Sequence, residues 1–248
     1  MLGLEIEPNL GGRAKVTVSY TFKTLRATLV GFAPISIISA IVTPTARPLL
    51  QSFKDHAVLL VGLLATMWAL EVVDFLLPIA NLDQLGIRPR TTRGLMGILL
   101  SPFLHVGFGH LISNSIPFLL LGGLVMMGGS RRFLMLSLWV TLAGGGGVWL
   151  LGGSRTVHLG ASLLIFGYLG FLLTRGIAER SIGGVLVSLG LLFGYGGMLY
   201  GVLPGQPGIS WLGHLSGFLA GVAGAWFFRK DRPKFPARIE FGNRAGGL

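Results

Sequence analysis

The sequence predicts an all-α membrane protein, a bundle of six transmembrane helices. Hydrophobic residues make up 52% of the 248 residues and charged residues only 12%, and the mean hydropathy is +0.73. Such values lie outside the range of soluble domains. The chain also contains separate apolar stretches, each near the length of about 20 residues that a helix needs to cross a bilayer. These stretches cover residues 57–79, 108–128, 133–152, 159–175, 182–203 and 211–228.

All of these stretches are predicted to be helices, because lipid offers no hydrogen-bond partner to a backbone that is not paired within its own segment. A longer connection, residues 80–107, follows the first predicted span. It contains the apolar sequence GLMGILLSPFLHVGFG, which Pro102 and several glycines interrupt. We therefore expect a half-embedded loop with short interfacial helices there, and no further span.

The positions of lysine and arginine predict the orientation. If the N-terminus lies in the cytoplasm, 16 of the 20 basic residues fall on the cytoplasmic side, as the positive-inside rule requires. The four that remain outside are Arg88, Arg90, Arg93 and Arg155. The net charge of +11 is therefore attributed to cytoplasmic segments that meet anionic lipid. Nucleic-acid binding is not expected, since no basic stripe alternates with aromatic residues.

Three regions are predicted along the chain: a cytoplasmic or interfacial N-terminal segment (1–55), a membrane domain (56–229) and a basic cytoplasmic tail (230–248). The uncharged stretch Ala27–Pro44 is compatible with an additional span, an interfacial helix or part of a small cytoplasmic domain. We favour a cytoplasmic or interfacial element, because a seventh span would place four basic residues of the first 26 outside. The absence of cysteine from the sequence excludes disulfides and thiolate metal sites.

Polar side chains from three predicted helices reach the same depth. Ser162 lies about three residues inside the fourth span and His214 about three residues inside the sixth, while His110 and Asn114 lie in the first turns of the second. All three helices enter from the outer side, so at 1.5 Å per residue these side chains lie about 5–10 Å below the outer boundary. Polar groups are costly within lipid, and their shared depth therefore indicates a functional site.

A hydroxyl and an imidazole at one depth are typical of nucleophilic catalysis. Neutral imidazole takes the proton of serine near neutral pH, so Ser162 is the candidate nucleophile and His214 the candidate base. Attack on an amide creates an oxyanion, which needs donors already in place. His110 and Asn114 share a helix face at i,i+4 spacing, and Gly160 keeps the start of the fourth helix open for backbone donors. No carboxylate accompanies this set, which predicts a dyad.

Each of these residues alone also has a structural interpretation. Ser162 follows a glycine and an alanine, as helix-packing serines in membranes do, and His214 is compatible with a satisfied hydrogen bonder. Phe166 lies one turn below Ser162, where its ring would pack under the imidazole. Gly217 belongs to a series of small residues in the sixth span that predicts close helix packing and a rigid site.

The other ionisable groups are expected to have structural roles. His105 and His158 are predicted to be interfacial, and His56 begins the first span on the cytoplasmic side. Glu71 and Asp74 lie near the outer end of that span. Their carboxylates could form a proton or ion site, but we favour a role in which they reach the membrane surface or anchor the loop. No metal and no cofactor is expected, because no carboxylate or cysteine joins the histidines at ligand spacing.

Together these motifs resemble the rhomboid family of intramembrane serine proteases. The family pattern is His-x-x-x-Asn in the second span, Gly-x-Ser in the fourth, and His followed by Gly-x-x-x-Gly in the sixth. This chain has HLISN (His110–Asn114), GAS (Gly160–Ser162) and HLSGFLAG (His214–Gly221). The resemblance covers about residues 57–228, includes the long loop after the first span, and implies a six-helix rhomboid-like bundle.

The resemblance implies a role for each site residue. Ser162 would be the nucleophile, and His214 the general base and later the general acid toward the leaving amine. His110, Asn114 and the backbone N–H of Ser162 would form the oxyanion hole. Phe166 matches a position where the family often has a tyrosine stacked on the catalytic histidine. Many members have glycine directly after the serine, and this chain departs from them with Leu163.

The expected function is hydrolysis of peptide bonds in or near transmembrane segments of other proteins. The expected partners are those substrates and the lipid bilayer of a prokaryotic plasma membrane, with both termini cytoplasmic; no oligomeric state is predicted. The fifth span and its outer loop, residues 204–210, are expected to act as a gate. Two other classes stay open: a catalytically silent rhomboid-like protein that binds membrane clients, and, less favoured, a small transporter, which would be expected to show an internal repeat that the sequence lacks.

Overall fold

The computed structural model describes residues 2–7, 15–20, 46–77, 79 and 81–229. The chain divides into two compact units, Met1–Pro48 and Leu49–Leu248. The stretch Ala27–Pro44 and the basic tail, residues 230–248, lie outside the described residues. What the sequence predicts for them, and for the domain boundaries, therefore stays a prediction.

The first unit contains a strand pair that the all-α prediction did not include. Strand β1 (Leu2–Glu7) pairs with β2 (Lys15–Tyr20) as an antiparallel hairpin. The physical reason lies in the sequence pattern, because β1 reads LGLEIE, with an apolar residue at every second position, and β2 contains the β-branched run Val-Thr-Val. The hairpin adds a small β element at the N-terminal end, and every other described element is a helix, in agreement with the predicted all-α class.

From residue 46 on, the helices follow the predicted apolar stretches closely. Four segments are long and apolar enough to cross a membrane: residues 54–76, 107–126, 130–151 and 182–202. The first of these segments lies in α2 (Ala46–Leu76) and the second is α4 (Gly107–Met126). The third consists of α5 (Ser130–Trp139), η3 (Val140–Gly144) and α6 (Gly145–Leu151), and the fourth of α8 (Ile182–Tyr195) and η4 (Gly196–Val202). Two further helices, α7 (Ser162–Ala178) and α9 (Trp211–Phe227), complete the bundle.

Helices α7 and α9, at 17 residues each, are shorter than the four candidate spans, which have 20 to 23 residues. Such a helix is about 25 Å long at 1.5 Å per residue, whereas the hydrocarbon core of a bilayer is about 30 Å thick. The described residues thus hold four candidate spans, and the count of six transmembrane helices stays a prediction.

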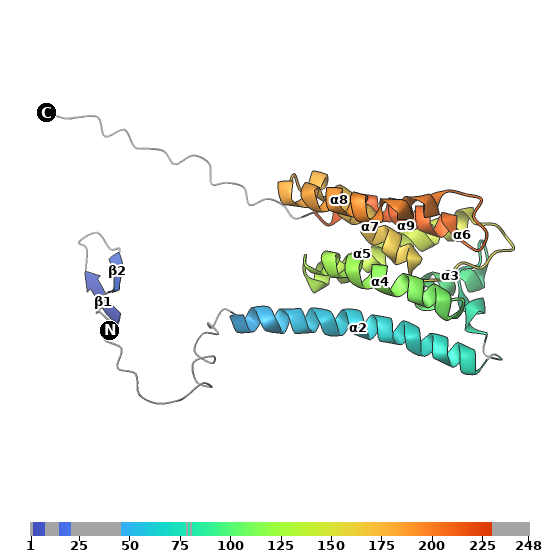
Figure 1. The fold of residues 1–248 in the computed structure, drawn as a ribbon, viewed down its shortest axis with the longest axis horizontal. Helices are drawn as coiled ribbons and strands as arrows, with labels where there is room; N and C mark the ends of the chain where they lie inside the picture. The colour runs from blue at the N-terminus through green and yellow to red at the C-terminus, as the bar shows by residue number, and fades with distance from the viewer. Residues whose placement is uncertain (1, 8–14, 21–45, 78, 80, 230–248) are drawn as a thin grey trace. The chain divides into compact units, whose positions relative to one another are not determined.

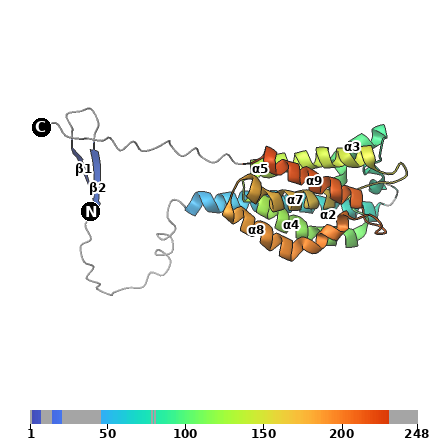
Figure 2. The same cartoon turned by 90° about the horizontal axis from the view of Figure 1, so that it is seen from above.

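Helix α7 lies in the middle of the bundle, next to α4, α8 and α9 (Figures 1 and 2). Residues 161–172 are all buried, which suits a helix that is apolar around its whole circumference. Helix α9 approaches it through glycines: a Cβ added to Gly217 would collide with the carbonyl of Leu163, and one added to Gly221 with the carbonyl of Gly167. The small residues of the sixth predicted span therefore do form a close packing surface.

The third predicted span also packs on α9 through glycines. It is one continuous helix, α5–η3–α6, with a π-helical turn at η3. A Cβ on Gly144 would lie 3.2 Å from the Cα of Gly217, and one on Gly147 would lie 3.0 Å from the Oγ of Ser216. The indole of Trp139 donates to the carbonyl of Ala220 at 2.8 Å. These contacts hold α9 in place between two helices.

The loop after α2 folds into short helices, as predicted: η1 (Leu82–Leu85), α3 (Thr92–Leu100) and η2 (Ser101–Phe103). Asp74 anchors it, because its Oδ1 accepts a hydrogen bond from the Leu82 N–H at 2.6 Å. The Arg90 guanidinium donates to the carbonyls of Leu150 and Gly152 at the end of α6. We call the end of the bundle formed by residues 81–106, 152–161 and 203–210 the loop end.

Candidate active site

Gly160 and Ala161 lead the chain into α7. Gly160 has φ of +117°, a conformation that side chains rarely adopt, and a Cβ there would lie 2.6 Å from the Cε1 of His110. The Gly160 N–H donates to the carbonyl of Ser101 at 2.8 Å, and the Ala161 N–H donates to Nε2 of His105 at 3.2 Å. Both hydrogen bonds fix this segment against the loop after α2.

Ser162 is the first residue of α7, and not a residue inside the helix as the predicted span implied. The first bond of the helical ladder runs from the Ile165 N–H to the Ala161 carbonyl. The N–H groups of Ser162 and Leu163 therefore precede the ladder and have no helical acceptor. Ser162 is 8% exposed, so its hydroxyl lies in a nearly buried position beside unpaired backbone donors.

His214 lies in the first turn of α9, and two contacts orient its ring. Its Nδ1 lies 2.9 Å from the carbonyl of Gly201, and a carbonyl only accepts, so Nδ1 carries the proton and Nε2 is the free acceptor. The ring of Phe166 stacks on the imidazole with centroids 4.1 Å apart and planes 10° apart. The tautomer that results is the one that a general base needs at Nε2.

His110 and Asn114 supply donors from α4. The Val106 N–H points to Nδ1 of His110 at 3.5 Å, which leaves Nε2 to carry the proton. The Nδ2 of Asn114 is buried and has no hydrogen-bond partner among the described residues. The described residues therefore leave Nδ2 of Asn114 available to an acceptor that enters the cavity which this side chain lines.

A cavity of about 660 Å³ joins these groups. Ser162, His214, His110, Asn114 and Phe166 all line it, so side chains from α4, α7 and α9 meet as the sequence predicted. Among the described residues no hydrogen bond joins the Ser162 hydroxyl to His214. The rest of the wall comes from α4, α7, η4 and the loop end, and includes Val106, Ser113, Pro117, residues 156–159, Ile165, Met198 and residues 208–210.

Two residues of the predicted site, Gly160 and Gly217, lie outside this cavity wall, and so does Leu163, the residue after the serine. Gly160 is behind Ser162, where its missing side chain makes room for His110. Gly217 is in the contact between α9 and α7. Leu163 is buried in the core and does not line the cavity, so the residue after the serine does not narrow the approach to it.

His105 and His158, which the sequence predicted to be interfacial, both lie in loops and make specific hydrogen bonds there. His105 is only 2% exposed and accepts the Ala161 N–H. Burial, helped by the neighbouring His110, lowers its pKa to about 4, so its ring stays neutral. His158 bonds to Ser210 and Thr156. The sequence held one signal for His105, which is its position at the end of the apolar loop sequence SPFLH. A polar ring in an apolar segment needs a hydrogen-bond partner if it is buried.

The described part of the chain brings no three His, Cys, Asp or Glu side chains close enough to hold a metal ion. What it does bring together is a hydroxyl, an imidazole with a free acceptor, and unpaired N–H donors in one cavity. The fold and the site thus define a helical membrane protein with a cavity that is lined in part by these polar groups.

The Rhomboid domain family model matches residues 92–231. The chain therefore belongs to the rhomboid family. The match includes α4, α7 and α9, the three helices that supply the cavity residues.

Mycobacterial proteins are similar to this chain over most of its length. Uncharacterized proteins of Mycobacterium tuberculosis and Mycobacterium bovis are each 42% identical over 190 residues, which is 73% of this chain and 79% of theirs. An uncharacterized protein of Mycobacterium leprae is 40% identical over 187 residues, or 72% of this chain and 74% of its own.

Proposed function

We propose that this protein is an intramembrane serine protease that hydrolyses peptide bonds in or near the transmembrane segments of other proteins. The observation that carries the proposal is the buried, unpaired Nδ2 of Asn114 in the cavity that Ser162 and His214 also line. A serine that only packs against a neighbouring helix would need no unpaired hydrogen-bond donor beside it. A serine that attacks an amide does need one, because the carbonyl oxygen becomes negatively charged.

In the first half-reaction, Nε2 of His214 removes the Ser162 proton as Oγ attacks the substrate carbonyl carbon. The resulting oxyanion is stabilised by Nε2–H of His110, Nδ2–H of Asn114 and the Ser162 N–H. Because no hydrogen bond joins Ser162 to His214 among the described residues, the Ser162 side chain first rotates toward His214. Catalytic hydrogen bonds often form only when substrate binds. The C–N bond then breaks, and His214 donates its proton to the leaving amine.

In the second half-reaction, water attacks the ester on Ser162. His214 takes a proton from the water, the oxyanion forms again in the same site, and the C–O bond to Ser162 breaks. The proton returns to the serine oxygen, so His214 and Ser162 end in their starting states. The products are a new carboxylate and a new amine.

The substrate must reach the cavity from the lipid, and we propose that α8 and η4 move to admit it. This segment, residues 182–202, is the least buried of the four candidate spans, and segments with few buried contacts open most readily. A helix has to unwind before its amide fits beside Ser162, so substrates with helix-weak residues at the cut are expected. We place the protein in a prokaryotic plasma membrane with cytoplasmic termini.

The second candidate is a catalytically silent protein that binds membrane clients. The observation in its favour is that no hydrogen bond joins Ser162 to His214 among the described residues. The two candidates differ in the reactivity of the serine, because a silent cavity would bind a client without forming a bond to it.

The test uses the purified full-length protein in detergent, a fluorophosphonate probe and a model transmembrane substrate. The wild type is expected to be labelled and to cleave, while Ser162→Ala and His214→Ala do neither. The matched control is Ser154→Ala, which removes an exposed serine from the neighbouring loop and should leave both signals intact. If Ser162→Ala cleaves as fast as the wild type, the protease mechanism is wrong; binding without labelling of the wild type would favour the silent protein.

A further inference from the structure

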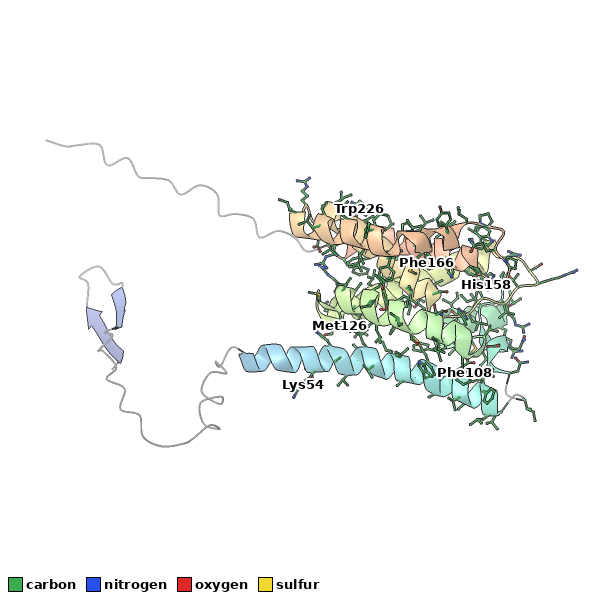
Figure 3. The ribbon with its side chains drawn as sticks, in the orientation of Figure 1. Lys54, Phe108, Met126, His158, Phe166 and Trp226 are labelled. Carbon is green, nitrogen blue, oxygen red and sulfur yellow. The ribbon has the colours of Figure 1, made fainter. Side chains whose placement is uncertain are left out.

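His158 and Ser210 hold equivalent positions in the two segments that deliver the dyad. His158 lies four residues before Ser162, and Ser210 lies four residues before His214. The Nδ1 of His158 and the Oγ of Ser210 are 2.7 Å apart. Figure 3 shows His158 at the loop end of the bundle, with Phe166 deeper inside. One hydrogen bond thus joins the segment that leads to the nucleophile and the segment that leads to the base.

The direction of each bond around His158 follows from counting protons. The Thr156 hydroxyl donates its only proton to the carbonyl of Gly153 at 2.7 Å, so it accepts from Nε2–H of His158 at 2.8 Å. In the neutral ring Nδ1 is then the acceptor, and Ser210 donates to it. Burial lowers the pKa of His158, which favours the neutral form that this arrangement requires.

The backbone of His158 is fixed on the side away from α9. His158 and Ile87 exchange two backbone hydrogen bonds, at 2.8 and 2.9 Å, and the next residues are held by Ser101 and His105. The segment 158–161 is therefore a rigid support. On the other side, Ser210 accepts the first bond of α9 through its carbonyl, from the His214 N–H at 3.0 Å.

We propose that the His158–Ser210 hydrogen bond is a positioning clasp that sets the distance and the register between Ser162 and His214. The proposal rests on the proposed protease function. Glycine contacts fix the spacing of α7 and α9 lower in the bundle, and the clasp fixes it at the loop end, where both dyad residues lie. Neither clasp residue reacts with substrate; both are positioning residues, and small displacements of reacting groups are known to be costly.

The clasp is tested with His158→Phe, Ser210→Ala and their double variant, in the full-length protein with the model substrate. His158→Phe keeps a ring and loses the acceptor. Each single variant should lower kcat about tenfold and leave KM within about twofold, because alignment and not ground-state binding is lost. The double variant should be no slower than the slower single variant, since both remove the same bond.

A conservative variant and a control sharpen the test. His158→Asn places an oxygen acceptor near the position of Nδ1 and should recover at least about half of the wild-type kcat. Thr66→Val removes an exposed hydroxyl of α2 that bonds only within its own helix and should leave kcat unchanged. The clasp is refuted if Ser210→Ala and His158→Phe keep the wild-type kcat, or if their losses multiply in the double variant.

Hydrogen exchange gives a readout that does not depend on catalysis. Loss of the clasp should speed amide exchange at His214, whose N–H bonds to the Ser210 carbonyl, in both single variants, while Thr66→Val leaves it unchanged. Unaltered exchange there would overturn the clasp even if the wild type proved inactive. A failure of the proposed protease function can be distinguished from a failure of the clasp, because it would appear as absent labelling of Ser162 in the wild type.

Discussion

The ring of Phe166 lies flat on the imidazole of His214, with centroids 4.1 Å apart and planes 10° apart. The stack covers one face of the imidazole, while the Gly201 carbonyl holds its Nδ1 edge. A ring that is held on a face and on an edge has little freedom to rotate, so Nε2 keeps one direction. The relationship connects a residue of α7 directly to the proposed base on α9.

Phe166→Leu is therefore expected to lower kcat about tenfold, because leucine fills the space but cannot hold the imidazole plane. KM should change little, since Phe166 does not need to contact the substrate ground state for this effect. Steady-state cleavage of the model substrate measures both constants. Phe171→Leu is the matched control, as it makes the same change at a buried position of α7 outside the cavity. Equal kcat values for the two variants would contradict the orienting role.

Asn114→Ala is expected to reduce kcat by about 10²-fold, the usual loss when one oxyanion donor is removed. The Nδ2 atom has no partner among the described residues, so its removal breaks no hydrogen bond of the folded protein there. Stability should therefore stay near the wild-type value, and a thermal melt in detergent checks this. A variant that keeps its kcat would show that Asn114 does not stabilise the transition state.

The helical layout and the meeting of Ser162, His214, His110 and Asn114 in one cavity were predictable from the sequence. Apolar stretches mark helices in lipid, and a shared depth can be counted in residues along each helix. Neither rule requires knowledge of how the helices pack. The residue at which α7 begins was harder to predict, because it depends on the positive φ of Gly160. A glycine in a sequence does not reveal which backbone angles it adopts.

The roles of His105 and His158 were not predictable in this way. Both lie in connections between predicted helices, where no periodicity assigns a side chain to a face. Their roles come from contacts over long separations in sequence, such as the bond from Ala161 to His105 and that between His158 and Ser210. The hairpin of β1 and β2 was missed for another reason: its strands are six residues each, shorter than the hydropathy patterns used to find helices.

Gly160→Ala is expected to abolish cleavage and labelling of Ser162. A methyl group at this position would lie 2.6 Å from the His110 ring, and the positive φ adds backbone strain. Gly146→Ala provides the control, because a Cβ there meets nothing within 4 Å and alanine is the better helix former. A fluorophosphonate labelling time course separates the two outcomes. Normal labelling of Gly160→Ala would mean that the Gly160–His110 contact relaxes at no cost.

Gly221→Ala is expected to destabilise the protein by about 1–3 kcal/mol, the usual cost of overpacking. Its Cβ would collide with the Gly167 carbonyl, and backbone gives way less easily than a flexible side chain. Gly190→Ala in α8, where a Cβ meets nothing within 4 Å, should be neutral or stabilising. Thermal unfolding in detergent measures both changes. Similar melting temperatures for the two variants would contradict close packing of α7 on α9.

His105 makes stability depend on pH in a known direction. Its folded-state pKa is about 4, whereas an unfolded histidine has a pKa of about 6.5. Between these values the unfolded chain binds more protons, so this contribution to stability is complete above about pH 6.5 and is lost as the pH falls toward about 4. Burial lowers the pKa of His158 as well, which acts in the same direction.

His105→Gln isolates the contribution of His105. Glutamine offers an oxygen acceptor to the Ala161 N–H but does not titrate, so the variant should lose less stability than the wild type between pH 7 and pH 5. The measurement is the difference in melting temperature between these two pH values for each protein. If both proteins lose the same amount, His105 titrates normally in the folded state, and its ring is open to water instead of supporting the segment before Ser162.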